Sequence, residues 1–119
     1  MTYQLSLLDK CPVNEGISTT EALHNTVRLA QVAEESGFLR FWVAEHHHSE
    51  NFASSAPEVL GAYLLASTRK IRIGTGGVML QHYSPYKVAE VFNLLSALAP
   101  GRVDIGIGKA PGGLPASTR

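Results

Sequence analysis

The sequence has no excess of charge of either sign, almost no cysteine and no long apolar run. Ten Lys and Arg residues offset ten Asp and Glu residues, so no basic stripe favours nucleic acid as a partner. No polybasic segment indicates a membrane surface, and no run approaches the roughly 20 apolar residues of a membrane span. Cys11 has no second cysteine to pair with, which excludes an internal disulfide and fits a reducing cytoplasm. The N-terminus has no secretory signal pattern, so we expect a cytoplasmic protein.

The sequence does contain enough hydrophobic residues to form the core of one domain, but not of two. It has 119 residues, of which 45% are hydrophobic, and we expect residues 1–119 to form one domain or part of one. Four short β-prone runs occur at 3–8, 39–43, 71–75 and 103–107. The last three begin 32 residues apart, which indicates a repeated structural unit.

Segments with helical periodicity and recognisable ends separate these runs. The first begins at Ser18, which forms a capping-box pattern with Glu21, and Gly37 is a suitable stop. Ser55 is the expected N-cap of the second helix, and Ser84, followed by proline, is that of the third. The second and third helices are expected at 56–66 and 85–98. Strands alternating with helices in this way predict a parallel sheet with right-handed crossovers.

Two α/β architectures account for this pattern. An open, doubly wound sheet of four or five strands suits a chain of 119 residues. A (β/α)₈ barrel has about 250 residues in units of about 31, close to the observed spacing, but four strands would be only half of one. Length therefore favours the open sheet and spacing favours part of a barrel, whose first and last strands would have unpaired edges.

Residues suited to chemistry follow each predicted strand. They are Asp9-Lys10-Cys11-Pro12, Glu45-His46-His47-His48, Gly74-Thr75-Gly76-Gly77 and Gly106-Ile107-Gly108-Lys109. Because ligands collect at the carboxyl ends of parallel strands, we expect an acid, imidazoles, bare backbone and a cation around one face of the sheet.

The run of one glutamate and three histidines at 45–48 is open to three interpretations. It could be a solvated loop, or His46 and His48 could share a metal ion with the glutamate. No second group of ligands exists, because His24 and His82 are isolated, so we expect no metal site. His46 acting as an acid/base or hydrogen-bond donor is the more economical interpretation, since one imidazole suffices.

The glycine-rich strand ends suggest where a ligand would lie. Gly76-Gly77 would let a planar ligand approach the backbone, or would form a bulge or tight turn. Gly108 and Lys109 would suit a phosphate, with amides and one ammonium as donors. An NTPase phosphate loop is excluded, because Ala110 stands where Ser or Thr should follow Lys109.

Five segments, in order along the chain, carry a resemblance to a known family. They are 5–9, 42–47, 54–58, 73–80 and 100–108. Together they resemble the bacterial-luciferase-like family of flavin-dependent monooxygenases. The resemblance implies a (β/α)₈ TIM barrel, of which residues 1–119 would be the N-terminal half with four β/α units. It also implies oxidation of a small organic substrate with reduced FMN and O₂, the FMN often coming from a separate NAD(P)H-dependent reductase.

The resemblance assigns roles to particular residues. His46 resembles the active-site histidine that lies near the flavin ring and assists its oxygen chemistry. Gly76-Gly77 matches a pair joined by a non-prolyl cis peptide under the isoalloxazine. Lys109 falls where luciferases carry an arginine that contacts the flavin phosphate, and it keeps the charge but loses the bidentate fork. Gly108 replaces a cysteine near the flavin. The expected cofactor-binding residues are Gly76, Gly77, Gly108 and Lys109.

The resemblance also implies partners. A homodimer is expected through the helices at 56–66 and 85–98, which carry more apolar residues than one barrel contact needs. These are Tyr63, Leu64, Leu65, Phe92, Leu94 and Leu95. The complementary C-terminal half should be required for activity. Two alternatives stay open: a non-catalytic flavin- or partner-binding protein of the same fold, and a flavodoxin-like open-sheet domain.

Overall fold

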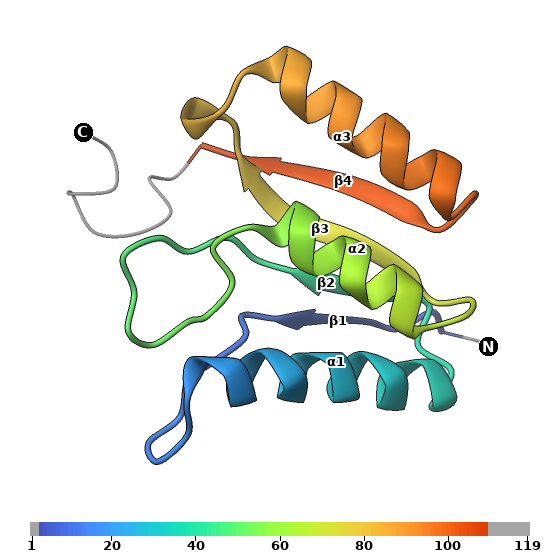
Figure 1. Ribbon diagram of the computed structural model, residues 1–119. Helices are drawn as coiled ribbons and strands as arrows, with labels where there is room; N and C mark the ends of the chain where they lie inside the picture. Colours follow the sequence, from blue (N-terminus) through green and yellow to red (C-terminus); the bar gives the residue numbers. More distant parts are fainter. Residues whose placement is uncertain (1–2, 110–119) are drawn as a thin grey trace.

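The computed structural model describes residues 3–109 (Figure 1). Residues 1–2 and 110–119 lie outside the described part. Ala110, which the sequence analysis used to exclude a phosphate loop, is one of them. The elements in order are β1 (Ser6–Asp9), α1 (Thr19–Glu35), β2 (Arg40–Val43), α2 (Pro57–Ser67), β3 (Arg72–Met79), the 3₁₀ helix η1 (Leu80–His82), α3 (Pro85–Leu98) and β4 (Val103–Gly108). Within this part, the predicted alternation of strands and helices is confirmed, with three complete β/α units and a fourth strand.

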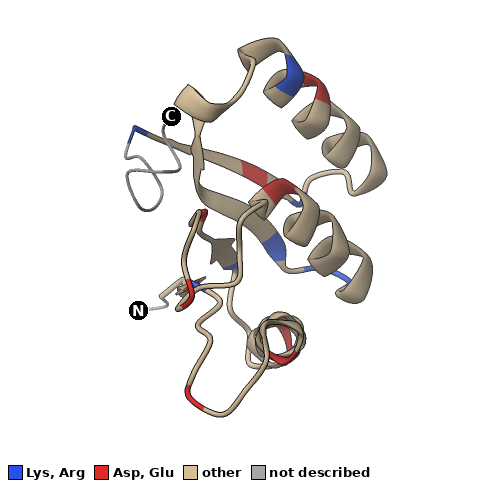
Figure 2. Cartoon of the chain, turned by 60° about the vertical axis from the view of Figure 1, so that its left-hand side comes forward, with Lys and Arg blue, Asp and Glu red and all other residues tan. Residues whose placement is uncertain are grey.

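The four strands form one parallel sheet in the order β1-β2-β3-β4. All three α-helices lie on the same side of it, as Figures 1 and 2 show from two directions. A doubly wound sheet reverses its strand order at a switch point and has helices on both faces. The described residues do neither, so the flavodoxin-like alternative is wrong, and the order is that of successive units of a barrel.

The predicted ends of α1 and α3 are confirmed by their hydrogen bonds. The Ser18 side chain accepts from the Glu21 amide at 3.1 Å, and the Ser84 side chain accepts from the Lys87 amide at 3.4 Å. After α1, Gly37 has a φ of +86°, the left-handed conformation that ends a helix at low cost for glycine.

The predicted start of α2 is wrong by one residue. Ala56 rather than Ser55 is the N-cap, and its side chain makes no capping hydrogen bond. Pro57 is the first helical residue; its fixed φ suits that position, and it has no amide hydrogen that would need a cap. The helix therefore runs one residue later than predicted, at 57–67 instead of 56–66.

β2 and β4 agree with the prediction to within one residue, and β1 and β3 differ more. β1 begins at Ser6, three residues later than expected. β3 continues to Met79, so Gly76-Gly77 lies inside the strand and not after it. The pairing of β3 with β4 shifts register between Thr75 and Val78, where the two glycines form an irregularity before regular pairing resumes.

The core lies between the sheet and the helices. Phe41, Val43 and Ile73 are at most 3% exposed and occupy alternate positions of their strands, as expected for one face of a sheet. They pack against residues of all three helices, which are Ala30, Ala33, Leu60, Leu64, Leu65, Val88, Phe92 and Leu95.

This core accounts for most of the apolar residues predicted to lie in a dimer interface. Leu64, Leu65, Phe92 and Leu95 are buried within the chain. Of the six residues predicted for the interface, only Tyr63, 55% exposed, and Leu94, 62% exposed, lie on the helix surfaces. The prediction that these residues are left over from the core and available for an interface is therefore wrong for four of the six.

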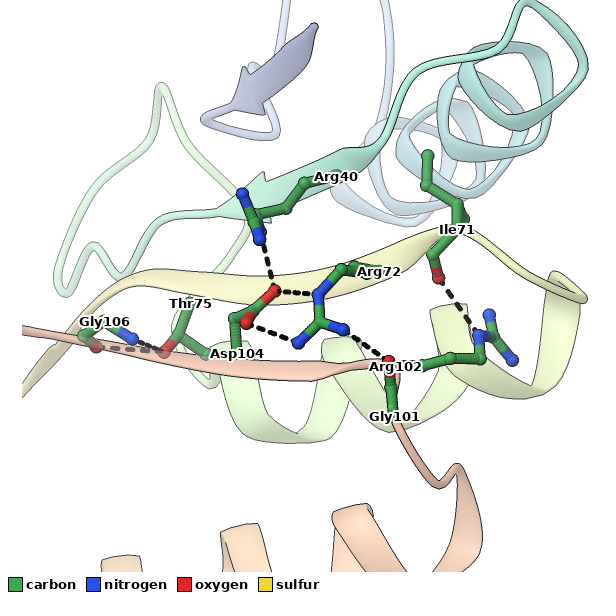
Figure 3. A network of polar contacts seen from close by, with 8 residues as sticks. All are labelled: Arg40, Ile71, Arg72, Thr75, Gly101, Arg102, Asp104 and Gly106. Carbon is green, nitrogen blue, oxygen red and sulfur yellow. Dashed lines mark hydrogen bonds and ion pairs between the residues drawn. The ribbon is translucent and has the colours of Figure 1, made fainter. Parts of the chain in front are cut away.

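The face of the sheet away from the helices carries a cluster of three charged residues (Figure 3). Arg40 of β2 donates to Asp104 of β4 at 2.6 Å, and Arg72 of β3 donates to both oxygens of Asp104 at 2.7 and 2.9 Å. The hydrogen bonds from Arg72 and then Arg40 hold the pKa of Asp104 below its ordinary value, although partial burial opposes them. The cluster links three neighbouring strands near their amino ends.

Next to this cluster, Trp42 lies against a strip of glycines. A Cβ added to Gly74 would lie 2.5 Å from two carbons of the Trp42 ring, and one added to Gly106 would lie 3.6 Å from it. The Arg40 guanidinium covers the ring at 5.4 Å from the centroid. The glycines of β3 and β4 thus make room for a large aromatic side chain on the uncovered face of the sheet.

Candidate functional site

The strand register brings the predicted site residues to one edge of the sheet. Val43 at the end of β2 pairs with Thr75, so the loop that begins with residues 44–46 lies beside the Gly76-Gly77 segment. Met79 pairs with Gly108, and Gln81 Nε2 donates to the Lys109 carbonyl at 2.9 Å. All of these residues therefore lie toward the carboxyl ends of β2, β3 and β4, at the left of the sheet in Figure 1.

The two central glycines have different surroundings. The Gly76-Gly77 peptide bond is cis, as the resemblance implies. A Cβ on Gly77 would lie 2.8 Å from the Ile107 carbonyl carbon, so the close approach of β4 excludes a side chain there. A Cβ on Gly76 would make only ordinary contacts of 3.5 Å with Leu8 and Trp42. Strand packing thus explains Gly77, whereas the neighbours of Gly76 leave room for other residues.

His46 is held so that one ring nitrogen is buried without a partner. Its amide donates to the Ser54 carbonyl at 2.8 Å, and its ring lies 4.5 Å from that of Phe52. Nδ1 is buried and makes no hydrogen bond within the described part of the chain. Burial, and then the positive charges of Lys10 and His47, lower the pKa of His46 below its ordinary value. The imidazole is therefore neutral near pH 7 and can accept a proton or hydrogen bond.

The loop after β2 borders an open pocket beside His46. The pocket has a volume of about 860 Å³, within the range of small-molecule sites. Its lining includes all three consecutive histidines together with residues from the loop and the start of α1, which are Thr19, His46, His47, His48, Ser49, Glu50, Asn51, Phe52, Ala53 and Ser55.

Two backbone hydrogen bonds fasten this loop to the loop after β1. The Val13 amide donates to the Asn51 carbonyl at 2.7 Å, and the Ala53 amide donates to the Cys11 carbonyl at 2.9 Å. Cys11 itself is fully buried, and burial raises the pKa of its thiol. These features make Cys11 a packing residue in this contact and not a nucleophile.

Sequence reasoning missed the hydrogen-bond network around Glu45. This side chain is fully buried and accepts hydrogen bonds from His47 Nε2 at 2.5 Å, the Tyr83 hydroxyl at 2.9 Å and the Met79 amide at 3.3 Å. Burial, followed by the hydrogen bond to Glu45, raises the pKa of Tyr83. Glu45 continues the alternation of Phe41 and Val43, and this spacing is the one sequence signal that places it on the helix side.

Metal ligation and membrane insertion have no structural counterpart in residues 3–109. No group of three or more His, Cys, Asp or Glu side chains there has an arrangement that could hold a metal ion. No helix in the same part of the chain combines the length and apolar character needed to cross a bilayer.

Comparison with known proteins gives a consistent result. A family model described as luciferase-like monooxygenase matches residues 4–117. N-acetyl-S-alkylcysteine monooxygenase of Bacillus subtilis (strain 168) is 64% identical over 115 residues, which cover 97% of this chain and 34% of that relative. The chain therefore spans about a third of the length of this relative.

Solved structures show the same fold. The crystal structure of apo-MsnO8 has a TM-score of 0.91 and 48% identity, and the match covers 96% of this chain and 35% of that one. The oxygenating constituent of 3,6-diketocamphane monooxygenase from Pseudomonas putida, a type II Baeyer–Villiger monooxygenase in complex with FMN, has a TM-score of 0.85 and 24% identity. The second match covers 92% of this chain and 30% of that one, and at this identity it speaks for the fold alone.

Proposed function

We propose, since this chain belongs to the luciferase-like monooxygenase family, that it forms the first part of an FMN-dependent monooxygenase. The enzyme would transfer one atom of O₂ to a small organic substrate and release the other as water, with two electrons from reduced FMN. The observation that carries this proposal is the shared sheet edge of His46, Gly76-Gly77 and Lys109. Within it, the buried Nδ1 of His46, which has no hydrogen-bond partner among the described residues, offers an acceptor for a ligand.

The residues at this edge fit the chemistry of FMN. Reduced FMN would supply the electrons that activate O₂. The side-chain-free backbone of Gly76-Gly77 would lie against the ring system, while Gly108 and the Lys109 ammonium would hold the phosphate. His46, neutral by virtue of its burial, would accept or return a proton beside the reacting atoms.

For the substrate we propose a small thioether. The B. subtilis relative, 64% identical, is named for its action on N-acetyl-S-alkylcysteine. An N-acetyl-S-alkylcysteine is therefore the first substrate to test, with product formation followed by mass spectrometry. Oxidation of other small organic molecules in preference to it would contradict the thioether class but leave the monooxygenase proposal intact.

The role of His46 is tested by replacement in the intact protein. If His46 acts as an acid/base, His46→Ala lowers kcat by roughly 10²–10⁴-fold. The matched control is His24→Ala, which removes an exposed histidine on α1 and should leave turnover unchanged. Substrate-dependent oxygen consumption is the assay, and a loss below tenfold would make His46 a packing residue. FMN binding without any oxygen consumption by the wild type would favour the non-catalytic alternative.

The role of Lys109 is tested by comparing two flavins. Lys109→Met should weaken FMN binding by roughly tenfold, the contribution of one charge-assisted hydrogen bond, and leave riboflavin binding unchanged because riboflavin has no phosphate. Lys109→Arg should restore or strengthen FMN binding. Flavin fluorescence titration measures both, and equal losses for the two flavins would contradict the phosphate contact.

We further propose that the intact protein is a homodimer through α2 and α3. Both helices keep apolar side chains on their outer surfaces, which are Val59, Tyr63, Tyr86, Leu94 and Leu98, and a second copy of the chain would cover them. Leu98 is 74% exposed, so Leu98→Asp should convert a dimer into a monomer without unfolding it. Sedimentation velocity is the measurement, and a monomeric wild type would refute the proposal.

Two further partners follow from the chain's share of its relatives. The C-terminal part of the barrel should pair with β1 and β4, the outer strands of the described sheet, and residues 1–119 alone should be inactive. A separate NAD(P)H-dependent reductase would supply reduced FMN, which fits the cytoplasmic location expected from the single cysteine. Turnover with chemically reduced FMN in place of a reductase would test this supply.

A further inference from the structure

One buried carboxylate joins three segments at the proposed site. Glu45 follows β2, and its side chain has no exposed surface. Its Oε1 accepts from the Met79 amide at the end of β3. Its Oε2 accepts from His47 and from Tyr83, which lies between η1 and α3. A side chain held in this way fixes the relative positions of two strand ends and one helix entry.

The charge of this carboxylate needs a counter-ion. Burying a carboxylate without an opposite charge is strongly unfavourable. The groups near it are the Tyr83 phenol, the Glu58 carboxyl of α2, whose pKa is raised by burial and then by the Glu45 charge, and His47. Among the described residues, His47 is a basic side chain in direct contact with Glu45, with its Nε2 2.5 Å from Oε2. His47 itself contacts the ring of His82 edge-on at 5.0 Å between centroids.

Two successive imidazoles therefore have different surroundings. His47 is joined to Glu45, whereas His46 lies on Phe52 with a buried nitrogen that has no partner in the described residues. Ser54 holds the backbone that leads into the two histidines. Its hydroxyl donates to the Ala44 carbonyl at 2.7 Å, and its carbonyl accepts from the His46 amide at 2.8 Å.

We propose that His47, as an imidazolium, is the partly exposed counter-ion of the buried Glu45, and that this ion pair fixes the end of β2 so that His46 faces the reacting atoms. Glu45 is then a positioning residue for His46. Two of the three consecutive histidines thus have different tasks, with His46 free for chemistry and His47 committed to structure. The part of this proposal that concerns turnover rests on the proposed function, whereas the ion pair does not.

A double-mutant cycle in the intact protein tests the ion pair without any assay of activity. His47→Gln removes the positive charge but keeps a hydrogen-bond donor, and Glu45→Gln removes the negative charge with little change of shape. We expect His47→Gln to lower the urea midpoint strongly in the wild type and much less in the Glu45→Gln background, where no buried charge is left unpaired. His48→Gln, at an exposed neighbouring position, is the matched control. Equal effects of His47→Gln in both backgrounds would overturn the ion pair.

The ¹⁵N chemical shifts of His47 give a second test that needs no variant to fold. Shifts of both ring nitrogens typical of imidazolium at pH 7.5 support the ion pair, and those of a neutral ring overturn it. The histidine signals are assigned in the wild-type protein by correlating each ring with its own backbone resonances.

The positioning role is tested by separating turnover from binding. Glu45→Gln should lower kcat by roughly 10- to 100-fold, the cost of a misplaced catalytic group, and leave the Kd for FMN unchanged. Glu58→Gln removes a nearby carboxyl group that makes no described hydrogen bond to Glu45 and should leave kcat within twofold. Unchanged kcat in Glu45→Gln, or an equal loss of FMN affinity, would refute the positioning role. A wild type without turnover would refute the proposed function. The ion pair would still be tested by the double-mutant cycle and by the ¹⁵N chemical shifts.

Discussion

Replacing Asp104 with asparagine should destabilise the fold by leaving two arginines without their counter-ion. Asp104 accepts one hydrogen bond from Arg40 and two from Arg72, at 2.6 to 2.9 Å. The three side chains are 21–31% exposed, so solvent screens them more than a fully buried pair, whose disruption costs about 3–5 kcal/mol. We therefore expect Asp104→Asn to lower the free energy of unfolding by about 2–4 kcal/mol, including the repulsion between the exposed guanidinium groups.

Urea unfolding of the intact protein at pH 7 measures this loss. With a slope of about 2 kcal/mol per molar urea, the midpoint should fall by about 1–2 M. Glu15→Gln, which replaces an exposed carboxylate in the loop after β1, should change the stability by less than about 0.5 kcal/mol. A midpoint change in Asp104→Asn no larger than in this control would refute the reasoning.

The loss of stability in Asp104→Asn should depend on pH. The arginine hydrogen bonds lower the pKa of Asp104 in the folded state, so its contribution is complete above the unfolded pKa of about 3.9 and disappears as the pH falls through the lower folded value. The difference between wild type and Asp104→Asn should therefore be constant from pH 7 to about 5 and shrink below about 4. A difference that persists in strong acid would show that charge is not its source.

Two other substitutions test features of the same sheet. Gly106→Ala would place a Cβ 2.1 Å from the Thr75 carbonyl oxygen and should cost more than about 2 kcal/mol. In contrast, a Cβ on Gly61 inside α2 would make only an ordinary contact of 3.8 Å with Ile73, so Gly61→Ala should stabilise by about 0.5–1 kcal/mol. Thermal unfolding of both variants should give Tm shifts of opposite sign. Glu34→Gln weakens three hydrogen bonds from the amides of residues 69–71 and should cost about 1–2 kcal/mol at pH 7. Although burial opposes them, these amides lower the pKa of Glu34, so urea titrations should show the cost vanishing as the pH falls below about 4, and a cost unchanged at pH 3 would contradict this origin.

Local signals in the sequence predicted the helix ends well. Ser18 and Ser84 cap helices because a short hydroxyl side chain can reach the first free amides. The prediction of Ser55 as an N-cap failed because Pro57 determines where α2 begins. Proline has no N–H group, so this position needs no capping hydrogen bond. Gly76-Gly77 resembled the end of a strand, yet Val78 and Met79 pair with β4 beyond it. A local pattern cannot show that pairing resumes after an irregularity.

Contacts between distant parts of the chain could not be predicted from the sequence. Arg40 and Asp104 are 64 residues apart, and Glu45 and Tyr83 are 38 apart. Nothing in the sequence beside these residues indicates their partners. The strand order brings Arg40 close to Asp104, and the segments that follow β2 and β3 bring Glu45 close to Tyr83. Four of the six residues named for the interface were misassigned for a related reason. Leu64 and Phe92, for example, pack in the core of their own chain, and periodicity does not say which partner an apolar face meets.

The sequential order of the four strands has a consequence for biosynthesis. Each strand of the described sheet pairs with the strand that precedes or follows it along the chain, so its partners emerge from the ribosome within a few tens of residues of one another. Contacts between such near neighbours carry a small loop-closure cost and form early. In the proposed intact barrel, the first β/α units can therefore reach their native pairing before the strand that joins β1 has been made. Nascent chains would spend that interval with one sheet edge open to pairing with other chains.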